Sequence, residues 1–187
     1  MRIRTEKGMA CMFWYFLLYS FLGFLLEVAF ARVVRSPKRD RKCFLFLPLC
    51  PVYGLGALGI LAAVELWGNN PLLLALVGAG VATVTEYLMG VFYQRVLGVE
   101  FWNYSELPLN LGGKVCLPFS MAWGLLALVL VYLLHPHVAV LVSQIPAWLT
   151  PAAAILLLTD SAASLWLLKT TGSTDSLKWY EAFLPAR

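Results

Sequence analysis

The chain has 187 residues, of which 61% are hydrophobic and 13% are charged, and its formal net charge is +4. Its mean hydropathy is +0.79. Soluble domains are closer to half apolar and a quarter charged, so a water-soluble chain of this length could not bury so much apolar surface. The composition therefore excludes an ordinary soluble protein. It predicts a single transmembrane domain over residues 1–187, with the lipid bilayer as its solvent.

Five apolar segments are long enough to cross the hydrocarbon core, which requires about 20 residues of helix. They are expected at residues 10–31, 47–67, 71–93, 115–134 and 147–168. Helices are predicted because every backbone N–H and C=O must find a partner without water inside a bilayer. The expected fold class is an all-α integral membrane protein with about five transmembrane helices. The short apolar stretch at residues 135–146 either extends the fourth helix or lies at the interface.

The basic residues are distributed unequally between the two sides of these spans. All of the 14 Lys and Arg residues except Arg2, Arg4 and Lys7 fall in the connections after the first and third spans or in the C-terminal tail. Cytoplasmic loops carry such an excess. A multi-pass protein of the cell inner membrane is therefore expected, with the N-terminus outside and the C-terminus in the cytoplasm. Attraction to anionic lipid headgroups accounts for the excess, and no nucleic-acid partner is expected.

Carboxylates inside the predicted spans are the main candidates for a functional site. An ionised Asp at a helix centre costs about 2.5–3.5 kcal/mol on insertion scales, so such groups usually face a bundle interior or a cavity. Glu27 and Glu86 each share a helix face with small residues, and we expect both to point into one cavity on the cytoplasmic half. Asp160 lies deepest. In the alternative interpretation, each acid only accepts hydrogen bonds from Tyr, Trp or backbone donors and stabilises packing.

Two Pro- and Gly-containing stretches, at residues 47–54 and 107–113, make regular helix improbable. Irregular backbone at membrane depth must be buried in protein or line a cavity. We therefore expect two half-inserted segments that cover the cytoplasmic mouth of the carboxylate site, rather than ordinary turns in an aromatic interface belt. The expected solute-binding residues are Glu27, Tyr53, Glu86, Trp102, Asn103, Tyr104, Asn110, Trp123 and Asp160. Trp102, Tyr104 and Asn110 are expected to pack against the first and third helices.

The first two spans and the next two follow a similar order of residues. Each pair has a glutamate, then a stretch with Cys and Pro, then a glycine, with Glu27 and Gly54 in the first pair and Glu86 and Gly124 in the second. This order indicates a parallel repeat of two helical hairpins, with the fifth helix added. Some transporters bind their substrates at such a repeat interface.

Four stretches of the sequence resemble a known family. They are "YSFLGFLLE", "PLCPVYGLGAL", "TEYLMG" and "FWNYSELPLNLGGKVCLPFSMAWGLLAL". Together they are similar to the bacterial ABC-transporter permease family of the CmpB type, also called type IV, over roughly residues 19–128. The family usually has Asp in place of Asn103 and Arg in place of Lys114. The resemblance implies a cell-membrane permease with a role in transport.

The chain has no Gly-rich phosphate loop, so it cannot hydrolyse ATP itself. The expected function is that of a permease-like subunit that binds or transports a small cationic or amphipathic solute at Glu27 and Glu86. It would act as a homo-oligomer or with a separate nucleotidase subunit. Two alternatives stay open: an intramembrane enzyme that uses these acids on a lipid-linked substrate, and a scaffold for a partner membrane protein. No cofactor is expected. No metal site is expected either, because His135 and His137 fall on the predicted outer side, away from the acids.

The predicted orientation can be tested by thiol accessibility. A cysteine placed at Ser36 should be protected from a membrane-impermeant reagent in intact cells, because this loop is expected in the cytoplasm. It should react after permeabilisation. Labelling at this position in intact cells would contradict the orientation.

Overall fold

The computed structural model describes residues 2–34, 43–67 and 70–178. Most of the predicted basic loop after the first span, including Ser36, lies outside these residues. Four described helices are long and apolar enough to cross a membrane, namely Gly8–Val33, Pro71–Leu97, Leu117–Ser143 and Leu149–Thr171, and a shorter apolar helix covers Pro51–Leu66. The prediction of an all-α membrane protein is confirmed.

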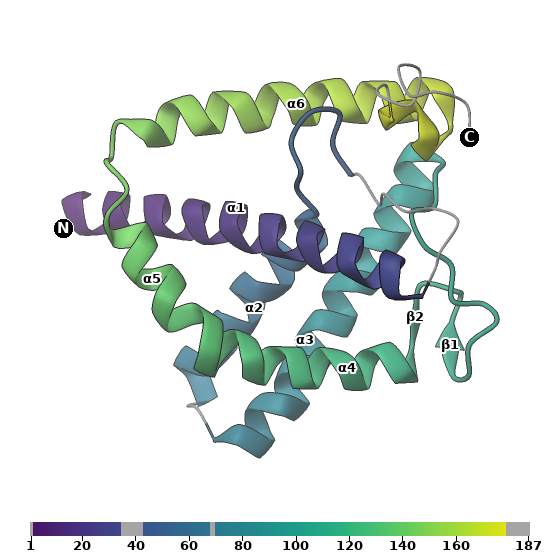
Figure 1. The fold of residues 1–187 in the computed structure, drawn as a ribbon, viewed down its shortest axis with the longest axis horizontal. Helices are drawn as coiled ribbons and strands as arrows, with labels where there is room; N and C mark the ends of the chain where they lie inside the picture. Colours follow the sequence, from purple (N-terminus) through teal and green to yellow (C-terminus); the bar gives the residue numbers. More distant parts are fainter. Residues whose placement is uncertain (1, 35–42, 68–69, 179–187) are drawn as a thin grey trace.

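Figure 1 shows the helices in chain order. They are α1 (Arg2–Val33), α2 (Pro51–Trp67), α3 (Pro71–Phe92), α4 (Leu117–Leu128), α5 (His135–Ser143) and α6 (Leu149–Thr171). Short π-helical segments, η1 (Tyr93–Leu97) and η2 (Val129–Leu134), follow α3 and α4, and a 3₁₀ turn, η3 (Thr174–Leu177), follows α6. α1 and α6 run in the same direction, and α4 runs in the opposite one (Figure 1).

Two boundaries differ from the expected spans. α2 begins at Pro51, four residues after the expected start, because proline has no N–H to donate and is best tolerated in the first turn of a helix. α4, η2 and α5 form the continuous helix Leu117–Ser143. The apolar stretch at residues 135–146 therefore extends the fourth helix, and α5 bends away from α4 where the π-helical turn and Pro136 interrupt regular geometry (Figure 1).

Residues 43–50 form a non-helical segment between α1 and α6. The N–H groups of Phe46 and Leu47 donate to the Asp160 carboxylate, with a shortest distance of 2.7 Å. At the other end of the segment, the Cys50 N–H donates to the backbone oxygen of Ser20 at 2.9 Å. Ser20 and Asp160 each lie near the middle of a long apolar helix. The segment therefore lies level with the midpoints of these two membrane-spanning helices.

Glycines allow α1 to approach α2, and α3 to approach α4, very closely. A Cβ atom at Gly54 would lie 2.6 Å from the backbone oxygen of Phe16 on α1. A Cβ atom at Gly78 on α3 would overlap the side chain of Ala127, which is buried on α4. Small residues serve the same purpose in many membrane proteins, because helix association in lipid depends on close packing.

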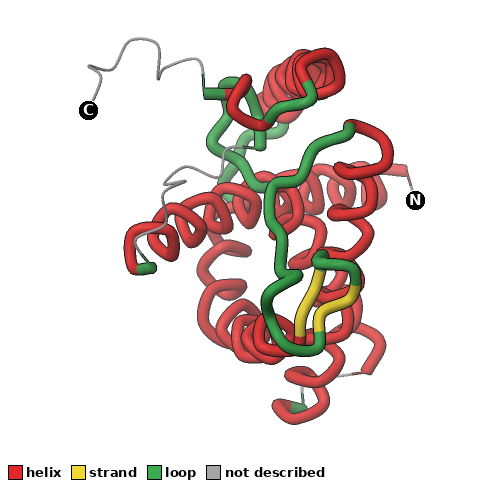
Figure 2. The backbone as a smooth tube through the Cα atoms, turned by 90° about the vertical axis from the view of Figure 1, so that its right-hand side faces the viewer, coloured by secondary structure: helices red, strands yellow, loops and turns green. Residues whose placement is uncertain are grey.

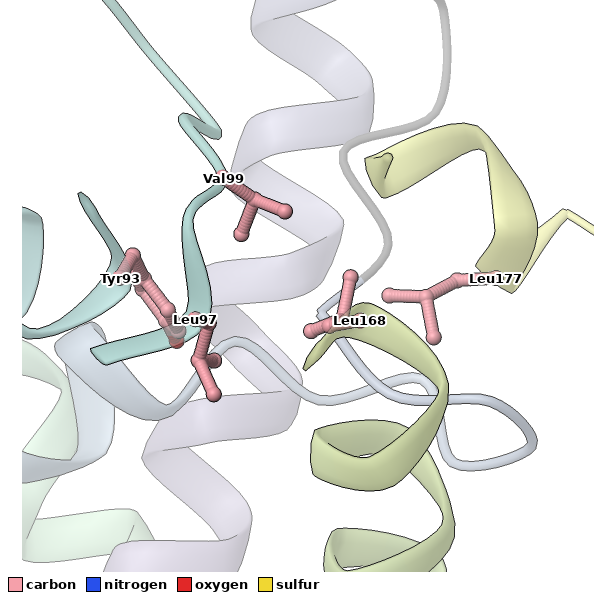
Figure 3. Packing of buried hydrophobic residues seen from close by; sticks show 5 residues of the cluster. All are labelled: Tyr93, Leu97, Val99, Leu168 and Leu177. Atoms are coloured by element: carbon pink, nitrogen blue, oxygen red, sulfur yellow. The ribbon is translucent and has the colours of Figure 1, made fainter. Parts of the chain in front are cut away.

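The long connection from α3 to α4 lies at one end of the helices (Figure 2). It includes a small antiparallel hairpin of β1 (Asn110–Leu111) and β2 (Val115–Cys116). Next to it, η1, α6 and η3 join in a cluster of buried side chains that Figure 3 shows. The cluster contains Tyr93, Leu97, Val99, Leu168 and Leu177. This cluster anchors the end of α6 beside the loop that carries Trp102 and Tyr104.

Two glycines of α3 provide a matched test of the α3–α4 contact. Gly78→Val should lower the free energy of unfolding in detergent by about 1–3 kcal/mol, because overpacking a tight contact forces helices apart. Gly80→Val is the control, since Gly80 is exposed and a Cβ atom there meets nothing within 4 Å. Thermal unfolding followed by tryptophan fluorescence measures both, and equal stabilities of the two variants would contradict the close α3–α4 contact.

Candidate functional site

Glu27 and Glu86 line the same small cavity, together with the aromatic side chains of Tyr53, Trp102, Tyr104 and Trp123. The cavity has a volume of about 20 Å³, which is room for about one water molecule. The structure thus brings together six of the residues expected at the site from the sequence.

Glu86 on α3 is held on both carboxylate oxygens. It is only 3% exposed. The Tyr104 hydroxyl donates to Oε1 at 2.9 Å, and the Trp123 indole N–H donates to Oε2 at 2.8 Å. Buried polar groups require such partners, because an unmade hydrogen bond in an apolar interior is costly. The helix α3, the loop and α4 therefore meet at one carboxylate.

Glu27 on α1 has a corresponding aromatic donor on α2. The Tyr53 hydroxyl donates to Glu27 Oε1 at 2.8 Å. The rings of Tyr53 and Trp123 then meet edge to face, with centroids 5.2 Å apart and an interplanar angle of 71°, a favourable geometry for aromatic pairs. A continuous chain of contacts thus runs from Glu27 through two aromatic rings to Glu86.

The loop between α3 and α4 positions Tyr104. Its backbone N–H donates to the Gly113 oxygen at 2.7 Å, and the Trp102 indole donates to the Lys114 oxygen at 2.8 Å. Gly112 and Gly113 both have positive φ, 58° and 69°, which glycine adopts without steric penalty. The tight turn that they form supplies the acceptors. The Tyr104 ring then stacks on Phe119 of α4, with centroids 4.8 Å apart.

The two glutamates make their contacts at matching places in the two helical hairpins. Tyr53 stands directly before Gly54 on α2, and Trp123 stands directly before Gly124 on α4. Each of these residues donates to the glutamate of the preceding helix. In each helical hairpin the donor is therefore the residue directly before the glycine of the repeat pattern, which is Gly54 in the first hairpin and Gly124 in the second.

The glycines repeat the pattern in the helix packing. A Cβ at Gly54 would lie 2.6 Å from the Phe16 oxygen, and a Cβ at Gly124 would lie 2.8 Å from the Ala75 oxygen. Phe16 and Ala75 stand at the same number of residues before Glu27 and Glu86 respectively. Both the polar and the close-packing contacts thus recur, and the cavity lies where the two hairpins meet.

The other three expected residues lie elsewhere. Asn103 is exposed; its side-chain oxygen accepts from the Ser105 N–H, and its amide contacts Glu100. Asn110 is also exposed, and its side chain makes hydrogen bonds to loop backbone. The expectation that Asn110 packs against the helices is therefore wrong. Trp102 and Tyr104 do contact α3. Asp160 accepts from the N–H groups of Phe46 and Leu47 and so holds residues 43–50.

Four further residues line the cavity that were not expected there, namely Cys43, Cys50, Val52 and Phe101. The Sγ atoms of the two cysteines lie 3.5 Å apart. Cys43 follows the basic loop in sequence, and Phe101 belongs to the polar loop, so neither has a local pattern that places it at membrane depth. The positions of Cys43 and Cys50 follow from the fold of residues 43–50, which the hydropathy of the chain does not specify, and Phe101 packs against that segment.

No group of three or more His, Cys, Asp and Glu side chains that could hold a metal ion occurs among the described residues. His135 lies away from the carboxylates, with Nδ1 2.8 Å from the Tyr19 hydroxyl oxygen.

The family model described as "Putative ABC-transporter type IV" matches residues 14–166. The chain belongs to this family. The match to the type IV family covers most of α1, all of α2 to α5 and most of α6, and so includes both glutamates and all of their aromatic donors. No curated protein and no solved structure matches the chain.

The role of Glu86 in holding α3, α4 and the loop together can be measured. Glu86→Ala should lower the free energy of unfolding by about 1–3 kcal/mol for each buried donor left without an acceptor. Glu86→Gln should cost less, because its amide oxygen can still accept one bond. In a double-mutant cycle, Tyr104→Phe should cost less in the Glu86→Ala background than in the wild type. Strictly additive effects would show that the two side chains do not interact.

Proposed function

We propose that the chain is a permease-like transport subunit that binds a small cationic or amphipathic solute between Glu27 and Glu86. Membership of the type IV ABC-transporter family and the apolar helices fit a transport-related membrane subunit. The observation that carries the site is the burial of Glu86 in a cavity that it shares with a second carboxylate, where two matching hairpins meet. Repeat interfaces are where many transporters bind their substrates.

The chemistry of the cavity favours a cation. Tyr104 and Trp123 are neutral donors, so the hydrogen bonds that they make stabilise an ionised carboxylate without removing its negative charge. Attraction between charges is stronger in a low-dielectric interior than in water. The aromatic faces of Tyr53, Trp102 and Trp123 add cation–π attraction for an organic ammonium group.

The cavity is closed in this conformation, because about 20 Å³ holds no organic solute. Binding therefore requires Tyr53, Trp123 or the loop that carries Tyr104 to move. Asn103 and Asn110 support that loop through its backbone, and Asp160 supports residues 43–50. We assign these three residues to the framework of the site. The excess of Lys and Arg in the connecting loops supports a mouth on the cytoplasmic side. In this proposal a nucleotidase subunit or a second copy of the chain completes the transporter.

The test is cation binding to the full-length protein in detergent, followed by tryptophan fluorescence. Ethylammonium and tetramethylammonium chlorides are titrated at constant ionic strength, with ethanol as a neutral comparison. We expect a saturable change for the cations. Glu27→Gln and Glu86→Gln should each weaken it by about tenfold or more, because hydrogen bonds and contacts to charged groups contribute about 1.5–3 kcal/mol.

Glu65→Gln is the matched control, because Glu65 is exposed near the end of α2 and lies outside the cavity. It should leave binding unchanged. Two results would contradict the proposal: no saturable response to either cation in the wild type, or a response that persists in both of the buried-site variants.

A further inference from the structure

A second and much larger cavity lies beside the carboxylate site. It has a volume of about 430 Å³, within the range of small-molecule pockets. We call it the apolar chamber. Apolar side chains of α1, α2, α4 and η2 form most of its wall, among them Leu22, Ile60, Leu126 and Leu130. A volume of this size with a mostly apolar lining is poorly suited to water and well suited to hydrocarbon.

The apolar chamber and the carboxylate cavity share part of one wall. Tyr53 and Trp123 line both spaces. Their polar atoms donate to Glu27 and Glu86 on one side. Their rings, in edge-to-face contact, border the chamber on the other. A molecule in the chamber therefore lies one aromatic layer away from two carboxylates.

The chamber opens sideways between α1 and the helix Leu117–Ser143. Leu25, Leu26 and Val129 line it and are also 46%, 41% and 40% exposed. In a bilayer, side chains exposed at this depth face lipid. Phe30 and Phe119 bridge the two helices toward one end of this opening, with ring centroids 6.0 Å apart. Tyr19 and His135 bridge them at the other end. Between these two bridges the chamber is continuous with the lipid-facing surface.

We propose that the apolar chamber binds the alkyl chain of an amphiphile that enters sideways from the bilayer. The α1 residues that line it run from Tyr19, near the middle of the span, to Ala29, close to its end at Val33. At 1.5 Å per residue this is a length of about 15 Å parallel to the helix. A chain in the chamber thus has the direction of a lipid tail, and its headgroup lies at the Glu27 end. The assignment of a cationic headgroup rests on the function proposed above.

Gly56 offers a way to fill the chamber without disturbing the helices. It is buried and lines the chamber, yet a Cβ atom there meets nothing within 4 Å. A larger side chain would therefore extend into the empty space. Gly80 on α3 is the matched control, because it also has open space around a Cβ atom but is exposed and lies outside the chamber. Gly56→Phe and Gly80→Phe make the same chemical change inside and outside the chamber.

The experiment uses the full-length protein in lipid nanodiscs and two photoreactive probes. One probe is a long-chain primary amine with a diazirine on its chain, and the other is the alcohol with the same chain. After illumination, labelled peptides are identified by mass spectrometry. We expect labelling of chamber residues on α1, α2 and α4, and competition by the unlabelled amine but not by ethylammonium. Gly56→Phe should reduce chamber labelling by about tenfold, because it removes apolar contacts of the chain, and Gly80→Phe should leave it unchanged.

The two probes separate this inference from the proposed carboxylate site. If the amine and the alcohol label the chamber equally, and Gly56→Phe removes both signals, the chain-binding site stands and the cationic headgroup is wrong. Labelling confined to lipid-facing surfaces such as that of α6, or chamber labelling that Gly56→Phe does not reduce, would overturn the inference. A disulfide-linked dimer through Leu26→Cys in a Cys11→Ser background, with the chamber unlabelled, would place a second copy over the opening and would also overturn it.

Discussion

A backbone that leaves helical geometry inside a bilayer must still satisfy its N–H groups, and this constraint shapes the whole molecule. Ser164 accepts from the Leu45 N–H at 2.8 Å, and Asp160 accepts from the next two N–H groups. Two side chains of α6 thereby accept the backbone hydrogen bonds that water would accept in a surface loop. Because residues 43–50 are held in this way, α2 begins near the middle of α1, and Tyr53 reaches Glu27.

The same arrangement of a glutamate, an aromatic donor and a glycine occurs in both helical hairpins of the carboxylate site. In each hairpin a glutamate accepts from an aromatic donor on the following helix, and the glycine after that donor allows the two helices to touch. The donors then meet each other at the centre. Polar groups are thus paired within each hairpin, whereas the contact between hairpins at this point is aromatic. The two hairpins can therefore move relative to each other without breaking these hydrogen bonds, because each glutamate keeps its aromatic donor within its own hairpin.

Much of the fold was predictable, because hydropathy specifies which segments prefer lipid. The convergence of Glu27 and Glu86 on one cavity was predictable for the same reason, since a carboxylate in an apolar span needs polar surroundings. The role of Asp160 was not, because its partners are backbone groups more than 100 residues away. The prediction that Asn110 packs against the helices failed because its amide makes hydrogen bonds to nearby loop backbone. Composition does not indicate which partner such an amide takes. The apolar chamber depends on gaps between helices, which no single segment encodes.

The π-helical segment η2 sets the helical phase of the fourth span. α4 turns Ala127 toward α3, whereas α5 turns Val138 and Val142 toward Tyr19 on α1. One helix thus presents different faces to two partners. Each residue of a regular α-helix rotates the following face by about 100°, so the number of residues in η2 determines which face α5 shows to α1. Deleting a single residue from η2 would swing His135 away from Tyr19 while leaving α4 in place.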